Sequence, residues 1–472
     1  MSQAFNRCGH QVEAVPSTMA EGNSEDSHPD GWPGQLWLEG RTVVHLLDEQ
    51  QRPTHMPRGP AKRTGPGFLN PAMAPARTRS VLLLNDALEH DWLVNDDKSI
   101  RVLDALCATG VRIRRWRNEI PTLSQNRLRI TANDLDAFAL NWARQSHSMH
   151  PPHQPINHEP EDDRYGKISN QVFENGLDFR QMDARIAMLG TGYQWIDLDP
   201  FGSPVQFLDA ALQGLSRTGV LEITATDTAA LTGSSASSQA RRYGAKGIVD
   251  VYAHDDAVRL LLATVATSAA RLDKTVIPLL ALFDGHHVRV SCLIKTSREK
   301  ASKVGENIGW RIREDDVPYR FVQHPTPEQV KRGSGPLWTG PLWSKEIAGR
   351  MTVEKALELC QPTSAELESL RLSGLEWSDD DVEYSTRELK RSVRYISDAA
   401  DLMSRDHLLL NLDALPKWAG VGGAPKLEKL IASLVDGGHA AARLPDLEPL
   451  LVTDAPFETV LEHVRNNSTS SK

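Results

Sequence analysis

The chain has 472 residues, of which 40% are hydrophobic and 24% charged, a composition typical of a globular protein long enough for two or three domains. It has no apolar run of the roughly 18 residues that a membrane-spanning helix needs. Its four cysteines lie too far apart for a disulfide framework or a structural zinc site. The net charge of −9 excludes indiscriminate coating of nucleic acid but allows a local basic face. We therefore expect a cytoplasmic protein without a membrane association.

Residues 1–40 are polar and rich in turn formers and contain no apolar signal core, which predicts a disordered leader. From about Ser99, short apolar runs alternate with helix-like stretches. The runs predict strands over 99–106, 128–136, 192–200, 219–227, 274–283 and 286–295. The stretches predict helices over 111–120, 136–147, 204–215 and 255–272. This alternation is typical of a mainly parallel sheet in a three-layer α/β domain, which we place at 41–297.

The last two apolar runs are joined only by "DGHH" and predict an antiparallel hairpin at one edge of that sheet. A histidine-rich insertion near 147–168 interrupts the pattern. It has no acid or cysteine at metal-ligand spacing, so we expect a solvated, flexible loop without a metal. Residues 298–472 are polar, helix-rich and punctuated by proline, which predicts a second domain.

The segment "VLDALCATGVR" joins a strand that ends in Asp104 to a helix. It lacks the G-x-G-x-x-G pattern that brings a backbone close to a pyrophosphate. Its small residues suit a ligand without phosphates, such as S-adenosylmethionine, and Arg112 is placed to meet a carboxylate of that ligand. The alternative is an ordinary turn between a strand and a helix.

Acids also follow the next two strand-like segments. Asp134, in "ITAND", is placed to bind both hydroxyls of a ribose. Its alternative role is a helix N-cap, for which Asp136 is better placed. Asp183 follows "QVFENG", taken as the third strand, and could accept from an adenine amino group or cap a helix. Together with Asp104, these acids lie where open α/β sheets bind ligands.

The segment "WIDLDPFGSP" delivers Asp197, Asp199, Pro200 and Phe201 to the end of a strand. A base amino group is a poor nucleophile, but a carboxylate and a backbone carbonyl can accept its N–H bonds and orient it toward a sulfonium methyl. Phe201 could stack on the base. We expect Asp197 to point to the opposite face of the strand, in a supporting role. The alternative for Asp199 is a helix cap, for which Ser203 is more suitable.

The blocks "IDLDPFGSP", "VLDALCATGVR", "TATDTAALTG", "GPLWTGPLW" and "FLNPAMAPARTRSV" together resemble the tRNA (guanine(26)-N(2))-dimethyltransferases, especially the archaeal ones. The resemblance implies a class I (Rossmann-like) S-adenosylmethionine-dependent methyltransferase domain with a C-terminal α+β domain. It also implies transfer of one or two methyl groups to the N2 amino group of a guanine in tRNA. Alternatives are another RNA or DNA as substrate, or an inactive tRNA-binding protein. We expect no stable protein partner.

The resemblance also implies roles for individual residues. Arg77 and Arg112 would contact the methionine part of the cofactor, Asp134 its ribose, and Asp183 with Ala184 its adenine. Asp199 would be the catalytic carboxylate, with Pro200 supplying a carbonyl. Phe68, Asn70 and Phe201 would lie around the guanine. The chain lacks the cysteine cluster that binds zinc in many members, so we predict no metal.

Four groups of basic residues could contact tRNA. They are Arg112, Arg114, Arg115 and Arg117; Arg241, Arg242 and Lys246; Lys331 and Arg332; and Arg387, Lys390, Arg391 and Arg394. The second group lies in a loop rich in glycine and serine that could close over the substrate. The last group has helical spacing, and its alternative is a solvated helix face with acidic partners such as Glu388.

Overall fold

A computed structural model describes residues 28–46, 69–93, 99–151, 171–445 and 449–469. The predicted leader up to residue 27, most of the histidine-rich insertion, and Phe68 lie outside these residues.

One mixed eight-stranded sheet forms the centre of the molecule, in the order β5-β6-β4-β3-β7-β8-β10-β9. Its strands are β3 (Ile100–Asp104), β4 (Leu128–Asn133), β5 (Gln171–Glu174), β6 (Leu177–Arg180), β7 (Tyr193–Leu198), β8 (Leu215–Ala225), β9 (Lys274–Phe283) and β10 (Val288–Thr296). β10 runs antiparallel to β8 and β9, which confirms the predicted hairpin at one edge. The third parallel strand is β6, whereas "QVFENG" forms the antiparallel edge strand β5.

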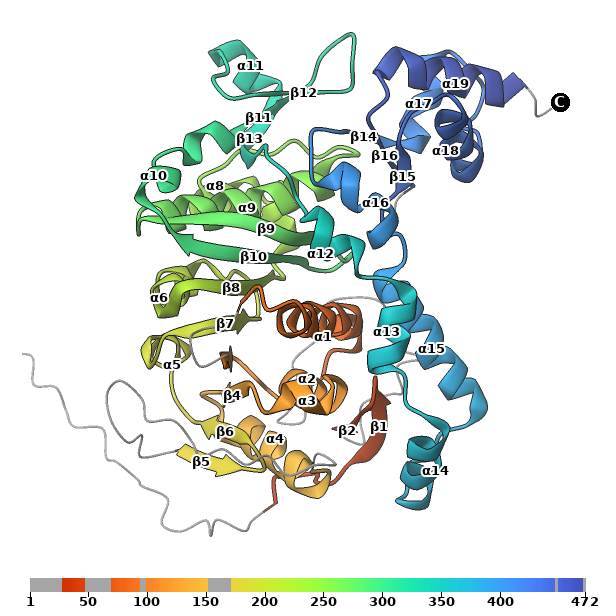
Figure 1. The fold of residues 1–472 in the computed structure, drawn as a ribbon. Helices are drawn as coiled ribbons and strands as arrows, with labels where there is room; N and C mark the ends of the chain where they lie inside the picture. The colour runs from red at the N-terminus through yellow and green to blue at the C-terminus, as the bar shows by residue number, and fades with distance from the viewer. Residues whose placement is uncertain (1–27, 47–68, 94–98, 152–170, 446–448, 470–472) are drawn as a thin grey trace, which may run out of the picture.

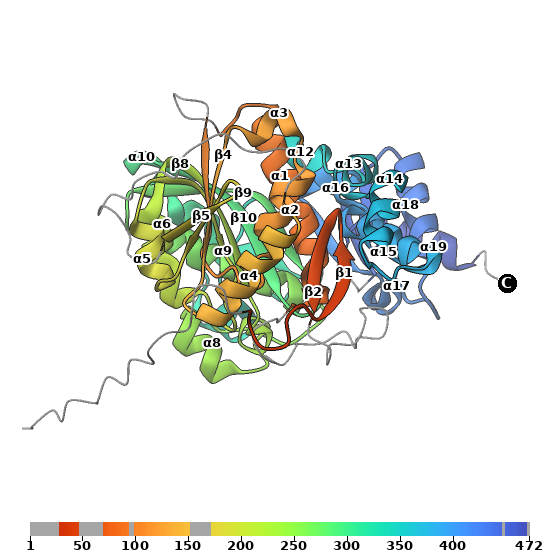
Figure 2. The same cartoon turned by 90° about the horizontal axis from the view of Figure 1, so that it is seen from below.

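Helices cover both faces of this sheet, as predicted for a class I methyltransferase domain (Figures 1 and 2). One face carries α1 (Ala74–Glu89), α2 (Val111–Glu119) and α4 (Ala137–Met149). The other carries α5 (Ala184–Leu189), α6 (Leu208–Gly214) and α9 (Ala253–Ala270). Shorter helical segments are η2 (Pro71–Met73), α3 (Thr122–Gln125), η3 (Val205–Phe207), α7 (Thr228–Leu231) and α8 (Ala236–Tyr243).

An antiparallel hairpin precedes the sheet and consists of β1 (Gln35–Glu39) and β2 (Thr42–Leu46). The expected disordered leader of residues 1–40 is therefore too long, because its last residues form β1. Gly40 turns the hairpin with φ of +60°, and a Cβ there would lie 2.2 Å from Glu119 Oε1. This close approach and the positive φ both require glycine.

The C-terminal part is α+β, with two small sheets in the orders β12-β11-β13 and β14-β16-β15. Its strands are β11 (Ile308–Ile312), β12 (Arg320–Val322), β13 (Gly333–Trp338), β14 (Leu408–Asn411), β15 (Ala441–Arg443) and β16 (Leu450–Thr453). Its helices are α10 (Arg298–Ala301), η4 (Val304–Asn307), α11 (Pro327–Lys331), α12 (Lys345–Gly349), α13 (Val353–Cys360), α14 (Ser364–Leu372), α15 (Asp379–Val393), α16 (Ile396–Met403), η5 (Leu412–Ala414), α17 (Leu415–Ala419), α18 (Leu427–Asp436) and α19 (Phe457–Thr469).

The hydrophobic core of the central sheet continues into α12, α13 and α16. Trp343 is buried there, and its indole Nε1–H donates to the carbonyl of Ala281 in β9 at 2.9 Å. A separate cluster joins β14 and β16 to α17, α18 and α19. None of the helices in the described part of the chain is long and apolar enough to cross a membrane.

Candidate active site

The order of the parallel strands changes direction between β3 and β7, because β4 and β6 extend the sheet on one side and β8 on the other. Open α/β sheets bind ligands beyond the carboxyl ends of their strands at such a point. Asp104 is the last residue of β3, and Asp199 directly follows β7. The fold therefore brings two of the predicted acids to the expected place.

Arg112 lies between these strand ends, in the first turn of α2, which begins after Gly110 with φ of +71°. Its Nη2 donates to Asp199 Oδ2 at 2.6 Å, and its Nε lies 3.2 Å from Asp197 Oδ1. The third nitrogen, Nη1, is buried and has no hydrogen-bond partner among the described residues. A buried donor without a partner costs free energy, so an acceptor such as a ligand carboxylate would suit this position.

The expectation that Asp197 and Asp199 point to opposite faces is wrong. Side chains two residues apart in a strand share a face, and both carboxylates contact Arg112. Asp197 is fully buried and also forms an ion pair with Arg289 of β10, whose Nη1 donates to Thr224 Oγ1 at 2.7 Å. These contacts fit the supporting role predicted for Asp197.

The carboxyl groups at the strand ends have different acidities. Burial acts to raise the pKa of Asp199, but the attraction of Arg112 and then of Arg289 outweighs it, and the pKa lies below its ordinary value. Burial, together with the nearby Asp197, raises the pKa of Asp104 well above its ordinary value. Asp104 therefore retains a proton over a pH range in which Asp199 is already ionised.

Replacing Asp104 by asparagine is expected to stabilise the fold increasingly as the pH rises. A carboxyl group whose pKa is raised by folding binds more protons in the folded chain, so its contribution to stability falls as the pH rises above the unfolded value. Asparagine has no such dependence and keeps the oxygen that lies 3.4 Å from the Leu106 amide nitrogen. Urea unfolding of both proteins at about pH 5 and about pH 8 measures the difference in unfolding free energy. A difference that does not grow with pH would contradict the assignment.

Of the two acids after β4, Asp136 rather than Asp134 caps the following helix, as predicted. Asp136 caps α4, since its Oδ1 accepts from the amides of Phe138 at 3.0 Å and Ala139 at 3.4 Å. Asp134 does not cap the helix. Its two oxygens accept from the amides of Ala108 and Asp136, each at 2.9 Å. Asp134 therefore links the loops after β3 and β4, where a ribose is expected, and its ribose contact stays a prediction.

Asp183 lies one loop further, at the N-terminus of α5, and accepts from the Arg185 amide at 2.8 Å. It also forms an ion pair with the Arg185 guanidinium at 2.6 Å, so the capping alternative is present. Ala184 begins the helix and is buried. The contacts of Asp183 and Ala184 with adenine stay predictions. The two neighbouring loops also carry exposed apolar side chains that no sequence motif indicated, Leu135 and Ile186, which could pack against a ring.

The turn after Asp199 exposes Phe201, with 62% of its surface accessible, beside the partly buried carboxylate. Gly202 follows with φ of +77°, a conformation that favours glycine. The amide of Gly202 donates to Thr226 Oγ1 at 2.7 Å, and its carbonyl accepts from the Thr226 amide at 3.0 Å. The end of β8 thus holds the turn that presents Phe201.

The next residue, Ser203, was expected to cap a helix, and this prediction is wrong. The helical turn η3 has Pro204 as its N-cap, and the Ser203 hydroxyl instead lies 3.0 Å from the Tyr243 hydroxyl. Tyr243 donates to Asp227 Oδ1 at 2.7 Å, and Arg242 donates to Asp227 Oδ2 at 2.9 Å. This chain of contacts ties α8 to the candidate catalytic turn.

Comparison with known proteins identifies the family. The model of the N2,N2-dimethylguanosine tRNA methyltransferase family matches residues 47–407. The chain belongs to this family. A tRNA (guanine(26)-N(2))-dimethyltransferase of Thermococcus kodakarensis is 29% identical over 415 residues, which cover 85% of this chain and 93% of that protein.

Other relatives support this assignment. A tRNA (guanine(26)-N(2)/guanine(27)-N(2))-dimethyltransferase of Aquifex aeolicus is 29% identical over 296 residues, covering 60% of this chain and 68% of that protein. Among solved structures, the complex of Trm1 from Pyrococcus horikoshii with S-adenosyl-L-methionine has a TM-score of 0.67 at 24% identity, covering 91% of this chain and 99% of that chain. The likeness confirms the fold expected from the sequence.

In this methyltransferase Arg77 is buried in α1 and held by protein groups. Its Nε and Nη2 donate to the carboxylate of Glu39 at 2.6 and 2.5 Å, and Nη2 also donates to the Asn70 carbonyl at 3.0 Å. The Asn70 side chain caps η2 by accepting from the Ala72 amide at 3.0 Å. The cofactor contact of Arg77 and the substrate contacts of Asn70 and Phe68 stay predictions, and the last lies outside the described residues.

The first predicted basic group does not form a surface for tRNA. Its arginines are all buried in α2, because that helix is covered by the hairpin and by α1. Arg114 donates to the Val43 carbonyl at 2.6 Å, and Arg117 donates to Gln125 Oε1 at 2.9 Å. A cluster of arginines in the sequence alone could not reveal this, because the packing of α2 on the hairpin and on α1 depends on tertiary contacts.

The second and third basic groups lie side by side in this family member. Lys246 Nζ donates to the carbonyls of Val330 and Lys331 at 2.8 and 2.9 Å, and Lys246 forms an antiparallel bridge with Gly335. Arg241 and Arg242 are exposed on the adjoining helix. Because α8 also contacts the catalytic turn, these cations and those at 331–332 extend from the candidate site toward the C-terminal part.

The fourth basic group is exposed along α15 and its C-terminus. Arg387 lies 3.6 Å from Glu383, and Arg391 lies 3.6 Å from Glu388. These acidic partners fit the alternative of a solvated helix face, and the role of this group in binding tRNA stays a prediction.

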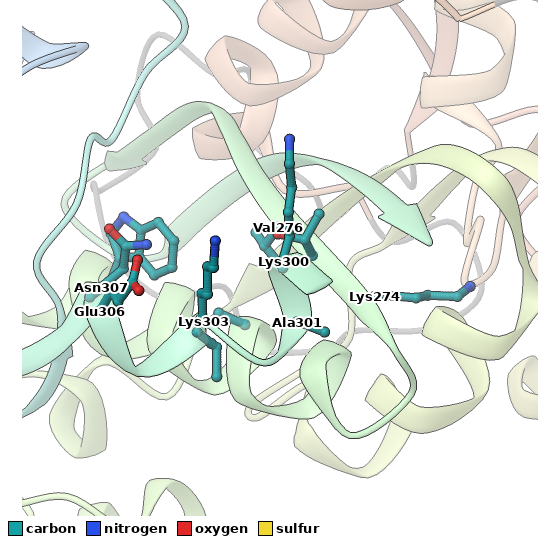
Figure 3. Close-up of a pocket in the computed structure, with 11 residues that line it drawn as sticks. Lys274, Val276, Lys300, Ala301, Lys303, Glu306 and Asn307 are labelled. Carbon is teal, nitrogen blue, oxygen red and sulfur yellow. The ribbon is translucent and has the colours of Figure 1, made fainter. Parts of the chain in front are cut away.

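A cavity of about 200 Å³ lies away from the candidate active site (Figure 3). It is lined by the start of β9 and by α10 and η4, with Lys274, Lys300 and Lys303 at its walls. β9 begins at the amino edge of the parallel strands, opposite the ends that carry Asp104 and Asp199. This cavity is therefore not the site of methyl transfer.

Proposed function

We propose that this chain transfers one or two methyl groups from S-adenosylmethionine to the exocyclic N2 amino group of guanine 26 in tRNA. Membership of the family supports the substrate class. The observation that carries the chemistry is the contact of Asp199 with Arg112 at the switch point of the sheet, 2.6 Å between Oδ2 and Nη2. It places an ionised carboxylate beside a strand-end loop suited to a cofactor without phosphates.

The residues present fit that cofactor. The unpartnered Arg112 Nη1 would donate a hydrogen bond to the methionine carboxylate, which Arg77 would also contact. Asp134, already bonded to the Ala108 amide, would hold the ribose hydroxyls, and the loop carrying Asp183 and Ala184 would hold the adenine. Asp104, whose pKa burial raises well above its ordinary value, would line the same loop.

When bound, S-adenosylmethionine supplies an electrophilic methyl group on its sulfonium sulfur. Asp199 and the carbonyl of Pro200 would accept the two N–H bonds of the guanine amino group, which directs the nitrogen toward that methyl. Phe201, exposed at the same turn, would stack on the base. Arg112 keeps Asp199 ionised, so Asp199 orients the amine as a hydrogen-bond acceptor and stabilises positive charge that develops on it.

The tRNA would lie along Arg241 and Arg242 of α8, Lys246 and the segment at 331–332; the contacts of Lys246 with Lys331 and Gly335 support this. Positive side chains at such a surface position a phosphate backbone without reading its sequence. A tRNA substrate would agree with a cytoplasmic location.

A methyl-transfer assay with labelled S-adenosylmethionine tests the proposal. We expect label to enter an unmodified tRNA transcript, and to be lost when guanine 26 is replaced by adenine. Nuclease digestion of the product should place the label in N2-methylguanosine or N2,N2-dimethylguanosine at that position. Label in the guanine 26 variant would assign another nucleotide, label in single-stranded DNA would favour the DNA alternative, and tRNA binding without transfer would favour an inactive protein.

A further inference from the structure

The hairpin formed by β1 and β2 ends at Leu46, before the family match begins at residue 47. It lies between the helices α1 and α2 of the catalytic domain and the helices α14 and α15 of the C-terminal part (Figure 2). Neither the sequence motifs nor the family match assigns it a role. The contacts of the hairpin with both halves of the molecule suggest a role for it.

One polar contact of the hairpin with the catalytic half is made by Glu39, which is 7% exposed. The carboxylate of Glu39 accepts two hydrogen bonds from Arg77, at 2.6 and 2.5 Å. Together with the bond to the Asn70 carbonyl, these contacts occupy Nε and Nη2 of Arg77. They leave Nη1 without a hydrogen bond to any residue that the structure describes. A two-point pair of this kind fixes the plane of a guanidinium as well as its position.

The same carboxylate begins a network that reaches the C-terminal part. Glu39 Oε1 accepts from Arg115 at 3.1 Å, and Arg115 also pairs with Glu119 at 2.8 Å. The Arg41 backbone amide, in the turn of the hairpin, donates to Glu119 Oε1 at 3.0 Å. The Arg41 side chain pairs with Glu366 of α14 at 2.5 Å.

The apolar side of the hairpin makes a parallel connection. Trp37 of β1 packs edge-on against Trp377, which precedes α15, with ring centroids 4.8 Å apart. Both rings belong to one buried cluster with Val111, the first residue of α2, and Leu375. Burial of this kind fixes the hairpin against α2 one residue from Arg112.

We propose that Glu39 is a positioning residue for the methionine carboxylate of the cofactor, acting through Arg77, and that the hairpin makes this position depend on the docked C-terminal helices. The inference rests on the proposed function, in which Arg77 contacts the cofactor. Without Glu39, the Arg77 guanidinium would lose two of its three hydrogen bonds and its fixed plane. Competition between the Glu39 carboxylate and the cofactor carboxylate for Arg77 would have the opposite effect.

Calorimetric titration of S-adenosylmethionine into the full chain distinguishes these effects. Glu39→Gln is expected to weaken cofactor binding about tenfold, the equivalent of about 1.4 kcal/mol, while tRNA affinity stays within about twofold. Because Glu39 acts through Arg77, the substitution should have no further effect in an Arg77→Ala background. Glu366→Gln, which breaks the link to α14, should weaken cofactor binding in the same direction by a smaller factor. Glu354→Gln, at an exposed position of α13, is the matched control.

Each other outcome overturns the inference in a different way. Tighter binding by Glu39→Gln would show competition rather than positioning. Unchanged binding by Glu39→Gln, with weak binding by Arg77→Ala, would remove Glu39 from the site and leave the proposed function intact. Unchanged binding by Arg77→Ala would remove Arg77 from the cofactor site and the inference with it. Circular dichroism and thermal unfolding of each variant verify that it is folded, and Glu39→Asp should restore part of the affinity.

Discussion

Asp199→Asn is expected to lower kcat for methyl transfer to tRNA by at least about a hundredfold, the effect of losing one preorganised electrostatic group at a reacting centre. The amide is nearly isosteric, but it carries no charge to stabilise the amine as it becomes positive. Cofactor affinity should fall little, because Arg112 keeps its contact with Asp197. Single-turnover transfer with saturating cofactor and tRNA measures this step.

The control for this experiment is Asp209→Asn, which changes an exposed aspartate at the start of α6 and should leave transfer unchanged. If Asp199→Asn transfers methyl groups within threefold of the wild-type rate, as an order-of-magnitude limit, the carboxylate is not catalytic. The capping alternative for Asp199 already lacks support, since the first helical turn after it has Pro204 as its cap.

Arg112→Met is expected to weaken S-adenosylmethionine binding by at least about tenfold and to lower the unfolding free energy by about 3 kcal/mol. Methionine keeps the length of the side chain but leaves Asp197 and Asp199 with one cation fewer in a buried site. It also removes the largest attraction that holds the pKa of Asp199 down, so this pKa should rise. Calorimetric titration and urea unfolding measure the first two effects.

The change in the pKa of Asp199 should also alter how methyl transfer by Arg112→Met depends on pH. In the wild type Asp199 is ionised throughout the neutral range, whereas in the variant it takes up a proton as the pH falls. Residual transfer by Arg112→Met should therefore decline between about pH 8 and about pH 6 more steeply than transfer by the wild type. Arg298→Met removes an exposed ion pair and should change stability by less than about 1 kcal/mol. Equal pH profiles for wild type and Arg112→Met would contradict the role of Arg112.

The sequence predicted the elements that position the site because their signals are local. The apolar runs over 99–106, 128–136 and 192–200 each contain a parallel strand, and the acids at their ends lie at one edge of the sheet. The short segment "DGHH" correctly predicted the edge hairpin. Asp136 was correctly preferred to Asp134 as a helix cap because the capping position is set by neighbouring residues.

The errors arose where contacts between residues far apart in the chain determine the structure. The arginines of α2 were counted as a basic cluster that could contact tRNA, but their partners include a backbone carbonyl and an acid far along the chain, Glu39. The strand β6 was overlooked because the run before it forms an edge strand with the same local pattern. The assignment of Asp197 to the opposite face misapplied the two-residue period of a strand, because this period places Asp197 and Asp199 on the same face.

The catalytic half and the C-terminal part share one hydrophobic core. Trp343 and the helices that follow it bury the outer side of β9, so the catalytic half is completed by residues that come after its last strand in the chain. A fragment that ended at residue 297 would present that apolar strand to water and lack its covering layer. The catalytic half of this chain therefore cannot be obtained as a folded unit by cutting it from the C-terminal part after its last strand.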